Sequence, residues 1–187
     1  DRVWMRDTGP IFIKDKKNKN ILLDWKFNGW AKYKNYRADN KVSLNIKNHY
    51  KGSIISPKFN KKSIVLEGGS IDVNGKGLLL TTKECLLSKI QQRNSFLKIK
   101  DYNHIFKKFF GVKKIIWLNK GIEGDDTHGH VDDIARFVKF NTVFLAYENN
   151  KKDNNYKNLN ENFEILKKIK VNFPNIKIRK IPMPRPI

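Results

Sequence analysis

The acidic residues of this chain gather at a few places where they could act together on one ligand. Five of its 18 acidic residues fall in one short segment, at Glu123, Asp125, Asp126, Asp132 and Asp133. Like charges held close together raise one another's pKa, so converging carboxylates need a cation among them. The sequence therefore predicts a site for a metal ion or for a cationic ligand.

A metal ion is the first alternative. Its ligands would be His128, His130, Asp132 and Asp126, because the His-x-His-x-Asp spacing is similar to the local spacing of several hydrolase metal sites.

A guanidinium group is the second alternative. Asp7, Glu67 and Asp132 would accept its N–H groups, since the planar fork matches a carboxylate and stays charged at any working pH. Trp4, close before Asp7 in the sequence, could lie along an alkyl chain or face the cation. Taken singly, Asp7 could also be a turn carboxylate and Trp4 a core residue.

An internal repeat would bring these residues together. A polar motif, a strand, a turn and a second strand recur three times, from near Asp7, Glu67 and His130, and Asp72 takes a matching place in the second copy. Each copy resembles a ββαβ block, which cannot bury both of its faces alone. We therefore expect several blocks around a shared axis, with their polar motifs at one end. Three unrelated hairpins with coincidental spacing are the alternative.

The helices of the second and third blocks have recognisable starts. Thr81 with Glu84 fits a capping box that opens a helix over 85–87, and a second helical stretch surrounds Phe106. In the third block, Asn160 precedes apolar residues at helical spacing. The strings KKIIWL and IKIRKIPM then predict a closing strand for each block.

Composition narrows the class of protein. A chain of 187 residues with 39% apolar residues is long enough for a folded core. The single cysteine, Cys85, excludes an internal disulfide framework and a cysteine-rich zinc site. The longest apolar runs are too short to cross a bilayer.

The net charge of +21 taken alone suggests a polyanion as partner. However, the 39 basic residues are 32 Lys and 7 Arg, and the lysines are scattered along the chain. Readers of nucleic acid depend more on Arg. We therefore expect a lysine-rich solvated surface with no nucleic-acid or membrane partner, and keep a basic nucleic-acid-binding module as the alternative of another class.

Four long strings resemble one known family. They are WMRDTGPIF, FNGWAKY, VLEGGSIDVNGKGLLLTTKECLL and GDDTHGHVDDIARF, and they extend in order from residue 3 to about residue 147. They are similar to the agmatine deiminases, a family that also contains the bacterial peptidyl-arginine deiminases and belongs to the guanidino-group-modifying enzymes.

The resemblance implies a fold and a reaction. The fold is an α/β, pentein-like five-bladed propeller of ββαβ repeats, of which residues 1–187 would be an incomplete central portion with about three blades. The reaction is hydrolysis of agmatine to N-carbamoylputrescine and ammonia, in putrescine biosynthesis. No metal and no organic cofactor is implied.

The resemblance also implies the residues that hold the substrate. Asp7 and Asp132 would grip the guanidinium nitrogens, and Trp4 would line the channel. Asp126 is a weaker candidate, for the far end of the substrate or for positioning the loop that carries His130.

The catalytic roles implied are those of a cysteine-dependent hydrolase. His130 would be general acid for ammonia and then general base for water, since the ordinary pKa of an imidazole lies near neutrality. Glu67 would orient His130 or share in holding the substrate. The nucleophilic cysteine of the family lies nearer the C-terminus than any residue here, and Cys85 corresponds to a structural cysteine.

The expected partner is a small cationic guanidino compound. Agmatine is favoured over arginine and peptidyl-arginine because no arginine lies between Phe27 and Tyr33, where the peptidyl-arginine enzymes carry them. His49 and His104 have no acidic motif nearby and receive no role. We expect a cytoplasmic protein; the sequence is compatible with a homo-oligomer and does not fix the oligomeric state.

Overall fold

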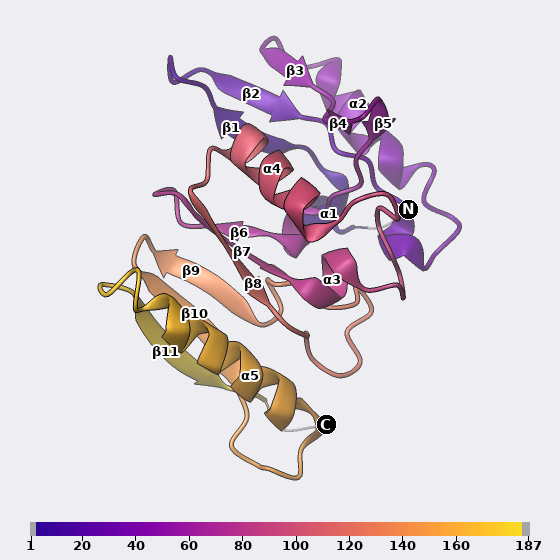
Figure 1. The fold of residues 1–187 in the computed structure, drawn as a ribbon. Helices are drawn as coiled ribbons and strands as arrows, with labels where there is room; N and C mark the ends of the chain where they lie inside the picture. Colours follow the sequence, from indigo (N-terminus) through magenta and orange to yellow (C-terminus); the bar gives the residue numbers. More distant parts are fainter. Residues whose placement is uncertain (1–2, 185–187) are drawn as a thin grey trace. The chain divides into compact units, whose positions relative to one another are not determined.

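The computed structural model describes residues 3–184 (Figure 1). The chain divides into two compact units, one of residues 1–68 with 89–97 and one of residues 69–88 with 98–187. Within residues 3–184, no helix combines the length and the apolar character that crossing a membrane requires.

The first unit is built on a sheet of three strands: β1 (Ile11–Lys14), β2 (Asn20–Leu23) and β3 (Ser53–Ile55). β1 and β2 form an antiparallel hairpin, and Asp15 closes its turn by accepting the backbone N–H groups of Lys17 and Lys19, each at 2.8 Å. β3 pairs with β2 in parallel, so the chain crosses over between them. Shorter elements complete the unit: α1 (Met5–Thr8), η1 (Gly29–Ala31), η2 (Asp39–Lys41), α2 (Val42–Lys47), β4 (Lys58–Phe59) and β5 (Lys62–Ser63).

The second unit contains two more sheets of the same plan, in each of which a hairpin is followed by a parallel third strand. One sheet consists of β6 (Asp72–Val73), β7 (Leu78–Thr82) and β8 (Lys114–Leu118). The other consists of β9 (Ala135–Lys139), β10 (Thr142–Tyr147) and β11 (Lys177–Pro182). The remaining elements are η3 (Gly68–Ser70), α3 (Lys83–Leu87), α4 (Ile99–Phe110) and α5 (Asn154–Ile169).

The predicted ββαβ order is confirmed in all three sheets, with corrections at three places. In the first block the sequence analysis located only the hairpin, and the structure adds the positions of α2 and β3. The cap of α3 is Thr82, not Thr81, because Thr82 is the residue whose side chain accepts from the backbone N–H of Cys85. α5 begins at Asn154 with Asp153 as its N-cap, well before the predicted Asn160.

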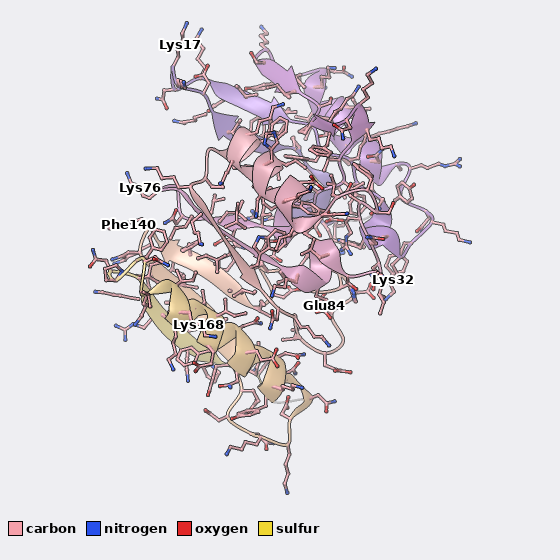
Figure 2. The ribbon with its side chains drawn as sticks, in the orientation of Figure 1. Lys17, Lys32, Lys76, Glu84, Phe140 and Lys168 are labelled. Atoms are coloured by element: carbon pink, nitrogen blue, oxygen red, sulfur yellow. The ribbon has the colours of Figure 1, made fainter. Side chains whose placement is uncertain are left out.

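The positive charge of the chain lies on its surface, as predicted. Of the described residues, the buried charged or titratable ones include no lysine and are Asp7, Asp24, Asp39, Glu67, Arg93 and His130, besides Cys85 and Tyr102. Figure 2 shows the side chains of Lys17 and Lys76 pointing away from the ribbon. Acidic groups are therefore placed inside a chain whose lysines remain hydrated, and Arg93 is the buried cation among the described residues.

The core of the second unit joins its two sheets to α5. Ile116 of β8 and Leu145 of β10 are 1% and 0% exposed and belong to the same cluster. The other fully buried or nearly fully buried members are Leu80, Leu118, Val131, Ile134, Ala135, Val143, Leu159 and Leu166. One apolar cluster therefore fixes β8 and β10, and with them the ends of the segment that connects β8 to β9.

This cluster predicts a large difference between two isoleucines. Ile116→Ala leaves a cavity in the cluster and should lower the free energy of unfolding by about 2–5 kcal/mol. Ile181→Ala in β11, where the side chain is 42% exposed, is the matched control and should cost less than about 1 kcal/mol. Urea denaturation of both variants measures the difference; equal losses would contradict the placement of the core.

Candidate functional site

His130 ends an irregular segment whose conformation is held by one carboxylate. The carboxylate is that of Asp125, which accepts from the backbone N–H and the hydroxyl of Thr127 at 2.7 and 2.6 Å. It also accepts from the backbone N–H groups of Gly129 and His130, at 2.6 and 3.1 Å. The backbone that carries the imidazole is therefore bonded to a side chain and not to a neighbouring strand.

α3 holds the same segment from the other side. The Thr82 hydroxyl donates to the carbonyl of Gly129 at 2.5 Å and accepts from the backbone N–H of Cys85 at 3.0 Å. Glu84 Oε2 accepts from the backbone N–H of Gly121 at 2.7 Å. Gly129 must be glycine, since its φ is +89° and an added Cβ would lie 2.9 Å from Glu84 Cβ.

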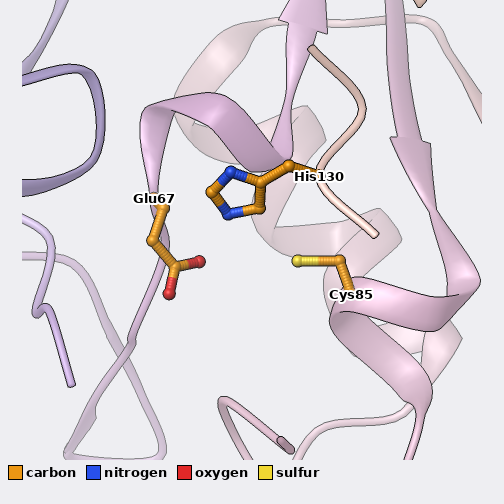
Figure 3. Close-up of side chains that lie close together, drawn as sticks. All are labelled: Glu67, Cys85 and His130. Atoms are coloured by element: carbon orange, nitrogen blue, oxygen red, sulfur yellow. The ribbon is translucent and has the colours of Figure 1, made fainter. Parts of the chain in front are cut away.

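The imidazole of His130 is 2% exposed and has two neighbours in the second unit that could affect its chemistry. Asp132 Oδ1 lies 3.8 Å from Nδ1. The thiol of Cys85, fully buried, points toward the ring, and its Sγ lies within 4.8 Å of a ring nitrogen (Figure 3). The burial of Cys85 agrees with its expected structural role, whereas its proximity to His130 was not predicted.

Asp132 also faces a cation of this chain. Its Oδ2 lies 4.0 Å from Nη1 of Arg136, and Nε of Arg136 lies 3.2 Å from Asp72 Oδ1. Asp72 Oδ2 accepts from the backbone N–H of Phe137 at 2.6 Å. Asp72 thus joins β6 to β9.

Two carboxyl groups beside His130 have shifted pKa values in opposite directions. Partial desolvation of the otherwise exposed Asp133 and the charges of Asp125 and Asp132 raise the pKa of Asp133 to about 6. Burial also acts to raise the pKa of Asp125, but the hydrogen bonds from Thr127 and Gly129 and the nearby His130 outweigh it and leave that pKa below its usual value. Asp125 therefore keeps its charge while Asp133 takes up a proton near pH 6.

In the first unit, Asp7 is 8% exposed, and its Oδ2 accepts from the indole Nε1 of Trp30 at 3.0 Å. Trp30 adopts a positive φ of 55° inside the predicted FNGWAKY string, and Gln91 donates to its carbonyl at 3.2 Å. Trp4 precedes α1 and is 60% exposed, so the core alternative for Trp4 is wrong.

Glu67 is fully buried in the first unit against a cation that the sequence analysis did not identify. Nε of Arg93 donates to Glu67 Oε1 at 3.0 Å, and both side chains are 0% exposed. The Arg93 guanidinium is held in turn by the carbonyl of Gln91 at 2.9 Å from Nη1. The sequence analysis expected Glu67 to face the guanidinium of a substrate. In the structure, Glu67 faces the guanidinium of Arg93 from the same chain.

Of the predicted residues, the structure brings His130 and Asp132 together within the second unit, whereas Trp4, Asp7 and Glu67 belong to the first unit. Asp126 is exposed. The metal alternative loses its ligand set: among residues 3–184, no group of three potential ligands includes His128, Asp126 or Asp132. His128 Nε2 instead lies 3.1 Å from the hydroxyl of Ser88. His49 and His104 are exposed.

A family described as Porphyromonas-type peptidyl-arginine deiminase matches residues 1–187. The chain belongs to this family. A family member from Latilactobacillus sakei, named "Putative agmatine deiminase", is 37% identical over 190 residues, which cover 98% of this chain and 50% of that protein.

Solved structures of two further relatives have the same fold. C. jejuni agmatine deiminase with substrate bound is 34% identical with a TM-score of 0.84, covering 98% of this chain and 52% of the other. The Enterococcus faecalis agmatine deiminase is 30% identical with a TM-score of 0.86, covering 98% and 50%. This family member therefore spans about half the length of the relatives it matches.

Three polar residues of the network were missed by the sequence analysis for different reasons. Arg93 lies outside every motif, so only the fold reveals its contact with Glu67. Asp125 and Asp126 are adjacent, and the sequence does not show which of them faces the backbone of residues 127–130. The cap was assigned to Thr81 because Glu84 lies three residues after it, as a capping box requires, and only the structure shows that Thr82 accepts from the backbone N–H of Cys85.

The raised pKa of Asp133 predicts a pH-dependent stability. Between its ordinary pKa and about 6, the folded state binds a proton that the unfolded state releases, so this contribution to stability is lost as pH rises through 6. Asp133→Asn does not titrate and so does not lose this stability. The melting temperature of Asp133→Asn minus that of the parent should therefore increase from pH 4.5 to pH 7.5. Asp133→Glu keeps a titratable carboxyl and is the control. A difference in melting temperature that stays the same at all pH values would contradict the raised pKa of Asp133.

Proposed function

We propose that the protein is a cysteine-dependent agmatine deiminase, which hydrolyses agmatine to N-carbamoylputrescine and ammonia on the route to putrescine. The observation that carries the proposal is the buried His130 with Asp132 at 3.8 Å, in a chain whose relatives bear the name of that activity. An imidazole beside a carboxylate is suited to pass a proton to ammonia and to take one from water.

The proposal includes the fold and the extent of the domain. Residues 1–187 would be the central portion of a single catalytic domain, a five-bladed α/β propeller in which each three-stranded sheet is one blade. Two observations support it: the three sheets repeat one strand order, and the chain spans about half of each relative.

In this proposal the reaction has two steps. A cysteine thiolate outside residues 1–187 attacks the central guanidinium carbon, a C–S bond forms, and ammonia leaves with a proton from His130. Water then gives a proton to His130 and attacks the same carbon, and the C–S bond breaks to return the thiolate and release the carbamoyl product. Glu67 orients His130 or shares in holding the substrate.

Substrate binding is assigned to carboxylates, since agmatine carries its charge on a guanidinium and an amine. Asp7 and Asp132 would accept the guanidinium N–H groups, and Trp4 would line the entrance to the site. Asp126 remains the weaker candidate, and its exposure suits a contact with the far amine better than with the reacting carbon.

A second substrate class, peptidyl-arginine or free arginine, is favoured by the description of the family. The segment Phe27–Tyr33 has no arginine to hold a substrate carboxylate, which favours agmatine. The protein expressed from its complete reading frame should release ammonia from agmatine with a kcat/KM at least about tenfold above that for arginine or a peptidyl-arginine. A preference for peptidyl-arginine would overturn the substrate, and no release from all three would overturn the reaction.

The role of His130 predicts a specific loss. In the complete protein, His130→Ala should lower kcat for agmatine about 100-fold or more, because both proton transfers lose their group. His104→Ala, an exposed histidine of α4, is the matched control and should keep the parent rate. Asp132→Asn should raise KM and lower kcat together. Near-normal turnover by His130→Ala would contradict the assignment.

A further inference from the structure

We propose that Asp125 is a positioning residue for His130, fixing the backbone from which the imidazole projects. The inference rests on the proposed function only for its effect on turnover. Asp125 contacts no substrate in this proposal and acts through the four hydrogen bonds that it accepts from Thr127, Gly129 and His130.

The segment depends on side chains because its backbone has an unusual conformation. Gly124, His128 and Gly129 all have positive φ values, at 79°, 62° and 89°. A segment that turns in this way cannot pair its N–H groups with a strand, yet those that are buried still need acceptors. Asp125 supplies the acceptor for the residues next to the imidazole.

Two other side chains hold the same segment, but neither bonds to the backbone of His130 itself. Thr82 holds the carbonyl of Gly129, and Glu84 holds the N–H of Gly121. Among the described side chains, Asp125 and Thr127 accept from the main-chain N–H of His130, at 3.1 and 3.4 Å. The Thr127 hydroxyl is itself bonded to Asp125, so both contacts depend on this carboxylate.

The charge of Asp125 gives the role a second, measurable consequence. The charge of His130 contributes to the lowered pKa of Asp125, and by reciprocity the Asp125 carboxylate favours the protonated imidazole. Within the second unit, the other groups facing His130 are Asp132, Asp133 and the thiol of Cys85. Loss of the Asp125 charge should therefore lower the pKa of His130 while Asp132 remains.

Two substitutions separate geometry from charge in the complete protein. Asp125→Asn keeps the shape but removes the charge and turns an NH₂ group toward backbone donors; kcat should fall about tenfold or more, with KM changed less than about threefold. Asp125→Glu keeps the charge but moves the carboxylate by one methylene, so kcat should fall while the pH at which activity rises stays unchanged. Asp101→Asn, which removes another carboxylate that accepts a backbone N–H, is the matched control and should keep the parent kcat.

NMR titration of His130 provides a readout that does not depend on the reaction. The chain has four histidines, so His130→Ala identifies the resonance. The pKa of His130 should fall by roughly 0.5 to 1 in Asp125→Asn and should stay unchanged in Asp125→Glu and Asp101→Asn. If the parent acts on no guanidino substrate but this pattern appears, the proposed function fails and the positioning stands. An unchanged His130 pKa in folded Asp125→Asn, or a normal kcat in Asp125→Glu, overturns the positioning.

Discussion

The geometry around His130 depends on hydrogen bonds from backbone N–H groups to side-chain acceptors. The segment between β8 and β9 has left-handed residues that prevent strand pairing, so Asp125 and Glu84 accept its N–H groups and Thr82 donates to its Gly129 carbonyl in place of a neighbouring strand. A carboxylate that accepts several N–H groups stays ionised and is difficult to replace, because each unmet buried donor costs about 1–3 kcal/mol. The core cluster fixes both ends of the segment, and these bonds fix the path between them.

The buried charges of the chain follow the same physical rule. Glu67 is paired with Arg93, Asp7 accepts from the Trp30 indole, and Asp24 accepts from the hydroxyl of Ser56 at 3.0 Å. Carboxylates that are taken out of water need such donors to remain charged. In a chain of net charge +21, the interior thus presents acidic groups while the lysines stay on the surface.

The sequence was most informative where local signals and the repeat agree. The strands of the second and third blocks were predicted because each lies beside a turn with asparagine or glycine, and β-branched or apolar residues follow at once. The start of α5 was wrong because its first turns are rich in asparagine, and the cap at Asp153 depends on a bond to Asn155 that composition does not reveal. His130 and Asp132 share one motif, so their proximity follows from the spacing, and their roles stay predictions. Arg93 and Asp125 required the fold, since the first lies in no motif and the second differs from Asp126 only in the direction of its side chain.

The acidic residues of the repeat fall into two groups according to what they bind. Asp72 and Asp125 accept backbone N–H groups and hold main chain in place, Asp72 between β6 and β9 and Asp125 within one segment. Asp132 differs, because its carboxylate lies 3.8 Å from the imidazole of His130 and 4.0 Å from the guanidinium of Arg136, which is longer than a direct hydrogen bond. A carboxylate held by longer contacts to side chains can exchange a partner more readily than one that accepts several backbone N–H groups. Of the five neighbouring acids in this segment, Asp125 therefore holds main chain, whereas the side-chain contacts of Asp132 are longer and leave its carboxylate less tightly bound.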